Sequence, residues 1–200
     1  MLQYIAGKST DFLFSKVEIE SEEREIYTYG FELFWSTFFS LSSMFILAVI
    51  FGYVPQIVVF VLFFLPIRMT AGGAHAASYR NCWCLSNLVS VGCVAAGDWL
   101  DRLQPPPLIS VALLIVAFGY IWREAPVRLA GESQREQIIE RNRRYSHVIL
   151  VIEAVVLIIF QGSGNGRMYY TAAIASYIVA IMIWIARGKR SYVSCSHENV

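Results

Sequence analysis

Residues 29–67, YGFELFWSTFFSLSSMFILAVIFGYVPQIVVFVLFFLPI, contain two long apolar runs separated by a short break. The first run, residues 29–51, provides the roughly 20 residues that a membrane-spanning helix needs. Gly52 and Pro55 mark the break, which predicts a tight turn and a hairpin of two helices. Of the 200 residues, 56% are hydrophobic and 16% are charged, whereas soluble domains have about 25% charged residues. The bilayer is therefore the expected solvent of this chain.

Four further apolar runs follow, so six stretches can cross the membrane or enter it partway. We expect an all-α integral membrane protein with about six transmembrane or partly re-entrant helices in one membrane-embedded domain. Residues 1–28 are expected to form a cytoplasmic amphipathic segment, 29–186 the helical bundle and 187–200 a cytoplasmic tail. The apolar runs are residues 29–51, 53–67, 84–97, 108–122, 148–160 and 168–186.

The basic residues predict the orientation of the chain. With a cytoplasmic N-terminus and six crossings, only Arg102 and Arg167 of the 16 lysines and arginines fall in outer loops. The positive-inside rule therefore predicts a multi-pass membrane protein with both termini in the cytoplasm. Residues 68–86 and the long polar segment 123–146 are expected on the same side. The net charge of +1 gives no reason to expect a nucleic acid partner.

Residues 68–86, RMTAGGAHAASYRNCWCLS, carry the groups best suited to chemistry. A thiol and an imidazole suffice for nucleophilic acyl transfer, which makes Cys82 a candidate nucleophile and His75 a candidate base. A helix that starts at Cys82 with Asn81 as its cap would place the thiol at the positive end of the helix dipole. On one helix His75 and Cys82 would be about 10 Å apart, so acting together requires a bend at Gly72-Gly73. Two side chains that merely fill an interfacial turn explain the spacing equally well.

The four cysteines are expected to be free thiols with different surroundings. Cys84 would point about 160° away from Cys82 on a helix, and it would lie deeper, beside Trp83. This favours Cys82 as the nucleophile. Cys93 falls inside an apolar run and is expected to be a small buried side chain.

Other polar residues each have a structural and a functional interpretation. Arg68 either anchors a helix end at the membrane surface or holds a substrate carboxylate or an oxyanion. Ser86 lines the site or packs between helices. Glu153, an acid inside an apolar run, orients His75 or pairs with a nearby arginine. Four loop arginines either capture an acidic part of the substrate or signal topology alone: Arg135, Arg141, Arg143 and Arg144.

A non-enzymatic membrane permease or sensor is the alternative function. It would use His75, Cys82 and Cys84 as soft metal ligands. The sequence lacks an obvious fourth ligand for such a site. The enzymatic interpretation requires no metal and no cofactor.

The order Arg68-x-x-x-Gly72-Gly73-x-His75, followed by Cys82 and Ser86, resembles the signature of the accessory gene regulator B family. The resemblance extends to Tyr29-Gly30 before the first run and Ala125-Pro126 at the start of the basic loop, and it covers nearly the whole chain. The loop departs from the family pattern in lacking a second proline after Pro126, where relatives often have one.

The resemblance implies a membrane cysteine endopeptidase of bacterial quorum sensing, with Cys82 as nucleophile and His75 as base. Its substrate would be a small autoinducer propeptide with an internal Cys or Ser. Cleavage of the C-terminal part would leave a thioester on Cys82, and closure would give a thiolactone or lactone. The protein would lie in the bacterial cell membrane. Apart from the resemblance, further candidates for binding the substrate or the oxyanion are Arg68, Gly72, Gly73 and Ser86. A homodimer in membrane lipid is also implied, and a partner would cover the shorter spans.

Overall fold

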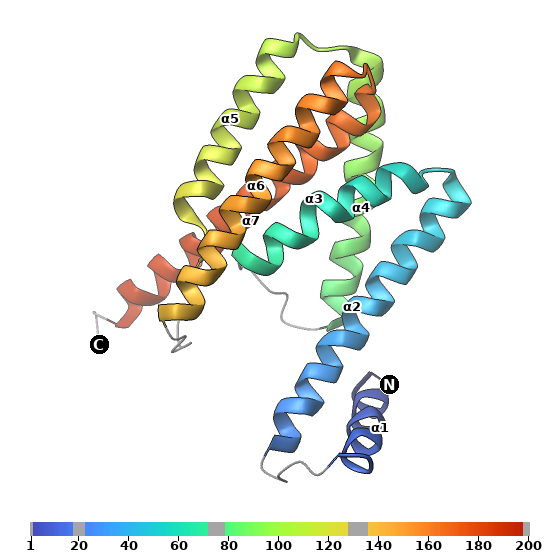
Figure 1. The fold of residues 1–200 in the computed structure, drawn as a ribbon, viewed down its shortest axis with the longest axis vertical. Helices are drawn as coiled ribbons and strands as arrows, with labels where there is room; N and C mark the ends of the chain where they lie inside the picture. Colours follow the sequence, from blue (N-terminus) through green and yellow to red (C-terminus); the bar gives the residue numbers. More distant parts are fainter. Residues whose placement is uncertain (1, 18–22, 72–78, 128–135, 198–200) are drawn as a thin grey trace. The chain divides into compact units, whose positions relative to one another are not determined.

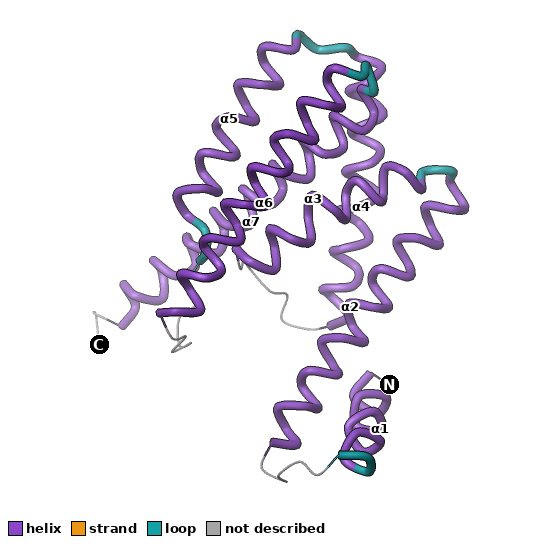
Figure 2. Tube along the Cα trace, viewed as in Figure 1, coloured by secondary structure: helices purple, strands orange, loops and turns teal. Residues whose placement is uncertain are grey.

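The computed structural model describes residues 2–17, 23–71, 79–127 and 136–197. Within these ranges every element of regular structure is an α-helix (Figures 1 and 2), which confirms the all-α prediction. The helices are α1 (Leu2–Phe14), α2 (Arg24–Phe51), α3 (Val54–Ala71), α4 (Tyr79–Leu103), α5 (Pro107–Glu124), α6 (Glu136–Gly162) and α7 (Gly166–His197).

Among these helices, α2, α3, α5, α6 and the Gly166–Gly188 part of α7 are long and apolar enough to cross a bilayer. The chain is therefore a multi-pass membrane protein. The 25 residues of α4 extend about 38 Å, which exceeds the hydrocarbon core of about 30 Å. Its lower hydropathy comes from charged residues near its two ends and from polar residues within the apolar run: Ser86, Asn87 and Ser90.

Glycines and prolines mark several helix ends, including the break predicted at Gly52. Gly52 caps α2 with a φ of 74°, and Gly164 has a φ of 69° in the connection between α6 and α7. Left-handed backbone of this kind suits glycine. Helix α4 runs further than predicted, through residues 98–102 to Leu103, because only the prolines from Pro105 onward prevent its continuation. Helix α6 joins the end of the polar segment 123–146 and the fifth apolar run into one element of 27 residues.

Contacts along the chain divide it into two compact units. Unit 1 comprises Met1–Gly52 and Ala76–Val89, and unit 2 comprises Tyr53–His75 and Ser90–Val200. The single membrane-embedded domain expected from the sequence stays a prediction.

In unit 1, the N-terminal helix α1 packs along the first half of α2 (Figure 1). Trp35 Nε1 donates to Ser9 Oγ at 3.0 Å, and Thr28 Oγ1 donates to Thr10 Oγ1 at 3.2 Å. These contacts show that the polar side of α1 is directed at a neighbouring helix.

In unit 2, α3 packs against α6 and α7, and α5 packs against α7 (Figure 1). The largest fully buried side chains of this unit include Phe60 and Ile67 of α3, Ile121 of α5 and Ile183 of α7. Gly97 allows α4 to approach α7 closely, because a Cβ atom there would lie 2.5 Å from a side-chain oxygen of α7. Such small-residue contacts are a common basis of helix packing in membranes.

Candidate functional site

Cys82 is the fourth residue of α4, which begins at Tyr79. The prediction that Asn81 caps a helix starting at Cys82 is wrong, because the helix begins two residues before Asn81. Cys82 nevertheless lies in the first turn, where the N–H groups of the first four residues have no acceptor inside the helix. Its side chain is partly exposed. A negative charge that develops beside this turn is stabilised by the helix dipole and by the free N–H groups.

Hydrogen bonds within unit 1 fix the rotation of this part of α4 against α2. Trp83 Nε1 donates to Ser43 Oγ at 3.0 Å, and Ser43 Oγ donates to Asn87 Oδ1 at 3.0 Å. Asn87 Nδ2 in turn donates to the main-chain oxygen of Trp83 at 2.9 Å. Trp83 and Asn87 are one turn apart, so the edge of α4 that they share faces α2.

The same rotation separates the two neighbouring thiols. Cys82 and Ser86 lie on one side of the α2-facing edge of α4, and Cys84 lies on the other side. Two thiols arranged in this way do not converge on one metal ion, which weighs against the predicted ligand set. Cys84 was expected to lie deeper than Cys82. Within the protein, however, Cys84 is exposed and Cys82 is half-buried. Cys93 is buried as predicted, and its thiol donates to a main-chain oxygen of α7 at 3.4 Å.

The residues His75, Gly72, Gly73 and Arg135 lie outside the described ranges, so their predicted roles stay predictions. Arg68 lies in the last turn of α3 and is half-buried. Its Nη1 donates to Met182 Sδ at 3.2 Å, and its guanidinium carbon lies 5.5 Å from the centre of the Phe64 ring. These contacts place the cationic group within unit 2, at the end of α3 from which the chain continues to Gly72.

Glu153 is buried in α6, with 3% of its surface exposed. It shares its helix face with the buried residues Ser146, Leu150 and Leu157. Neither carboxylate oxygen has a hydrogen-bond partner among the described residues, so the predicted pairing with an arginine is not found there. Burial of an unpartnered carboxyl group costs free energy, which makes this residue a continuing candidate for function.

The first turns of α6 carry Arg141, Arg143 and Arg144, all of which are exposed. In the part of the chain that the structure describes, none of the three forms an ion pair. Their guanidinium groups therefore have the accessibility that binding of an acidic ligand requires.

Both ends of the polar segment 123–146 are attached to the last turn of α3. Near its start, the N–H of Val127 donates to the main-chain oxygen of Ala71 at 2.8 Å. At its end, Ser146 Oγ donates to Thr70 Oγ1 at 2.9 Å. The two α3 residues directly precede Gly72 in the sequence.

A second set of contacts joins the helix ends around this segment. The rings of His147 and Trp122 are stacked, with centres 3.8 Å apart and planes 3° apart. His147 Nε2 also lies 3.1 Å from the main-chain oxygen of Trp122. This oxygen lacks its usual helical donor because the residue four positions later, Pro126, has no N–H. Glu124 forms an ion pair with Arg187 of α7.

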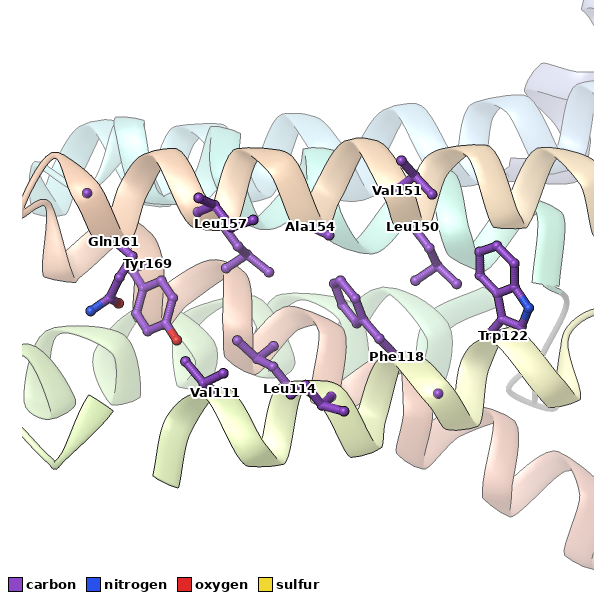
Figure 3. Close-up of a pocket in the computed structure, with 14 residues that line it drawn as sticks. Val111, Leu114, Phe118, Trp122, Leu150, Val151, Ala154, Leu157, Gln161 and Tyr169 are labelled. Atoms are coloured by element: carbon purple, nitrogen blue, oxygen red, sulfur yellow. The ribbon is translucent and has the colours of Figure 1, made fainter. Parts of the chain in front are cut away.

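An apolar groove of about 790 Å³ lies between α5 and α6 (Figure 3). Phe118 and Leu114 of α5 face Leu150 and Leu157 of α6 across it, and Trp122 lies at one end. Its lining contains no cysteine, histidine or carboxylate. The residues that line the groove therefore include none of the predicted catalytic groups.

The polar residues that join these helices are not among the site residues predicted from the sequence. Ser43 and Asn87 position the turn that bears Cys82, and Thr70 and Ser146 join α3 to α6. The available signal was a single polar side chain within or beside an apolar run, because such residues often form hydrogen bonds between membrane helices.

Comparisons with known proteins agree with the resemblance noted in the sequence. The family model "Accessory gene regulator B" matches residues 6–186. "Putative AgrB-like protein 2" of Clostridium perfringens (strain 13 / Type A) is 22% identical over 173 residues, which cover 82% of this chain and 81% of the relative. "Putative AgrB-like protein" of C. perfringens (strain SM101 / Type A) is 21% identical with the same coverage. No solved structure matches the chain.

Proposed function

The chain belongs to the accessory gene regulator B family, and from this we propose that it is a membrane cysteine endopeptidase that cleaves and cyclises a small autoinducer propeptide. Membership of the family gives the chain a role in peptide processing for quorum sensing. The observation that most supports the cysteine mechanism is the position of Cys82. It is a partly exposed thiol in the first turn of α4, seven residues after His75 in the signature.

In the proposed reaction, His75 removes the proton from Cys82 and the thiolate attacks a peptide carbonyl carbon. Main-chain N–H groups in the first turn of α4 stabilise the oxyanion that forms. When the peptide C–N bond breaks, the new amine of the C-terminal fragment receives the proton from His75. The N-terminal part remains as a thioester on Cys82.

Ring closure uses the internal Cys or Ser of the propeptide. Its thiol or hydroxyl group loses a proton to His75 and attacks the thioester carbon, which closes a thiolactone or lactone. The Cys82 sulfur leaves and regains the proton. A reaction site at a membrane boundary limits the competing attack by water.

The binding and membrane parts of the proposal rest on charge and helix length. Exposed arginines at residues 141–144 bind the acidic part of the propeptide through charge-assisted hydrogen bonds. Helix α4 crosses as a sixth span, since it is long enough and no charged residue lies between Arg80 and Asp98. Six crossings place both termini on one side, and the arginines predict the cytoplasmic side. Assembly as a homodimer is part of the same proposal.

Cleavage of the propeptide in proteoliposomes, followed by mass spectrometry of the products, tests this function. We expect Cys82→Ala and His75→Ala to abolish cleavage and thioester formation. Cys84→Ser is the matched control, because Cys84 and Cys82 lie on different sides of the α2-facing edge of α4. This variant should retain most activity. Cleavage by Cys82→Ala at the wild-type rate would refute the mechanism, and loss of activity in Cys84→Ser alone would identify the other thiol as nucleophile.

A further inference from the structure

We propose that Thr70 and Ser146 are positioning residues for the acidic part of the substrate. Their hydrogen bond, together with that between Val127 and Ala71, holds both ends of the arginine-bearing segment on the last turn of α3. This inference rests on the proposed function, because it concerns how the peptide is held for cleavage.

The Thr70 hydroxyl group is used as both donor and acceptor. Its Oγ1 lies 3.1 Å from the main-chain oxygen of Pro66 and 3.3 Å from that of Ile67, so it donates within its own helix. It accepts the hydrogen bond from Ser146 at the same time. Ser146 is completely buried, so its hydroxyl group has no access to water if Thr70 stops accepting.

Chain connectivity links this contact to both parts of the proposed site. His75 is the fourth residue after Ala71, so the two can be at most about 14 Å apart along an extended chain. On the other side, Ser146 follows Arg144 by two residues in a continuous helix. The same turn of α3 therefore leads into the catalytic segment and supports the helix that carries the arginines.

Neighbouring contacts preserve the fold when this hydrogen bond is lost. The stacked pair of Trp122 and His147 joins α5 to α6, and the ion pair of Glu124 and Arg187 joins α5 to α7. Loss of the Thr70–Ser146 hydrogen bond should therefore shift the start of α6 rather than unfold unit 2. Such a shift changes peptide binding more than it changes bond cleavage.

The test compares KM and kcat in proteoliposomes for an acidic propeptide and for the same peptide with its acidic residues replaced by amides. Thr70→Val retains the side-chain shape but leaves the Ser146 hydroxyl group without an acceptor, and we expect KM for the acidic peptide to rise roughly fivefold to tenfold. Ser146→Ala should raise it only about twofold to threefold, because Thr70 keeps its bond within α3. In each case kcat should stay near the wild-type value.

Two further variants give a signature that a general loss of stability would not give. The double variant Thr70→Val/Ser146→Ala has no orphaned hydroxyl group, so its KM should lie below that of Thr70→Val alone. Thr70→Ser should restore the wild-type KM. Matched controls are Thr37→Val in α2 and Ser163→Ala after α6, which are exposed hydroxyl residues bonded only to nearby main-chain oxygens.

Several outcomes would overturn the inference while leaving the proposed function intact. They are a Thr70→Val variant with the same KM as Thr37→Val, an equal rise in KM for both peptides, or a fall in kcat alone. A Thr70→Ser variant that fails to restore KM would also overturn it. Failure of the proposed function would be seen separately, as cleavage that does not depend on Cys82.

Discussion

Two groups of arginines in unit 2 differ in whether they form ion pairs. Where α4 ends and α7 begins, Asp98 lies 2.7 Å from Arg102 and 3.2 Å from Arg167, and Asp101 lies 3.5 Å from Arg167. Near the start of α6, the arginines of residues 141–144 are exposed and form no ion pair within the described ranges. The arginines where α4 ends and α7 begins have acidic partners, whereas the arginines of residues 141–144 are accessible to a ligand. Near the latter, Glu124 and Arg187 form an ion pair that joins α5 to α7.

This difference indicates which charges stabilise the fold and which can bind a ligand. The carboxylates of Asp98 and Asp101 are mostly covered, with 11% and 24% of their side chains exposed, so they need nearby cations. Exposed arginines need no such partner because water solvates them. Both basic residues assigned to the outside, Arg102 and Arg167, have acidic partners in the structure.

The largest expected effect is a difference in sidedness between the two ends. In a variant whose four native cysteines are replaced, Asn165→Cys should react with an impermeant maleimide in intact cells. Gln137→Cys, in the first turn of α6, should react only after the membrane is permeabilised. Reaction of both from the outside, or the reverse pattern, would refute the proposed orientation.

The helices could be predicted from the sequence more fully than the site could. Apolar runs, with Gly52 and the prolines from Pro105 as terminators, indicate the helices because these signals are local. The start of α4 at Tyr79 was missed, because the residues around Asn81 gave a cap signal that the structure does not use. Contacts such as Ser43 with Asn87 depend on which helices become neighbours, which no local pattern encodes.

The second prediction removes the open charges. Arg141→Gln/Arg143→Gln/Arg144→Gln should raise KM for the acidic propeptide about tenfold and leave kcat near the wild-type value, since each exposed contact contributes about 0.5 kcal/mol. The peptide with neutralised acids should show no such change. Raising the salt concentration should weaken binding to the wild type but not to the triple variant.

Two control measurements check that the triple variant keeps the fold and the membrane orientation of the wild type. The Asn165→Cys reporter should label from outside in the triple variant as it does in the wild type. Thermal unfolding in detergent should also be unchanged, because the three arginines have no described ion-pair partner to lose. Wild-type KM in a correctly oriented triple variant would show that these arginines signal topology alone.

The smallest expected effects lie at the paired end, where the two arginines are not equivalent. Arg167 contacts both Asp98 and Asp101, whereas Arg102 contacts Asp98 and has 74% of its side chain exposed. Arg167→Gln leaves Asp101 without a described ion-pair partner, and after allowance for solvent screening it should cost about 1 kcal/mol, or about 2–4 °C in detergent. Cleavage per folded molecule should be unchanged.

Arg102→Gln is the matched control at the same end. Because Arg167 still neutralises both acids, this substitution should change the free energy of unfolding by less than about 0.5 kcal/mol. An equal loss of stability in the two variants would mean that net charge, and not the bridging position of Arg167, holds this end together. A fall in cleavage by Arg167→Gln at unchanged thermal stability would contradict the division between a structural end and a binding end, because a paired charge would then be acting on the substrate.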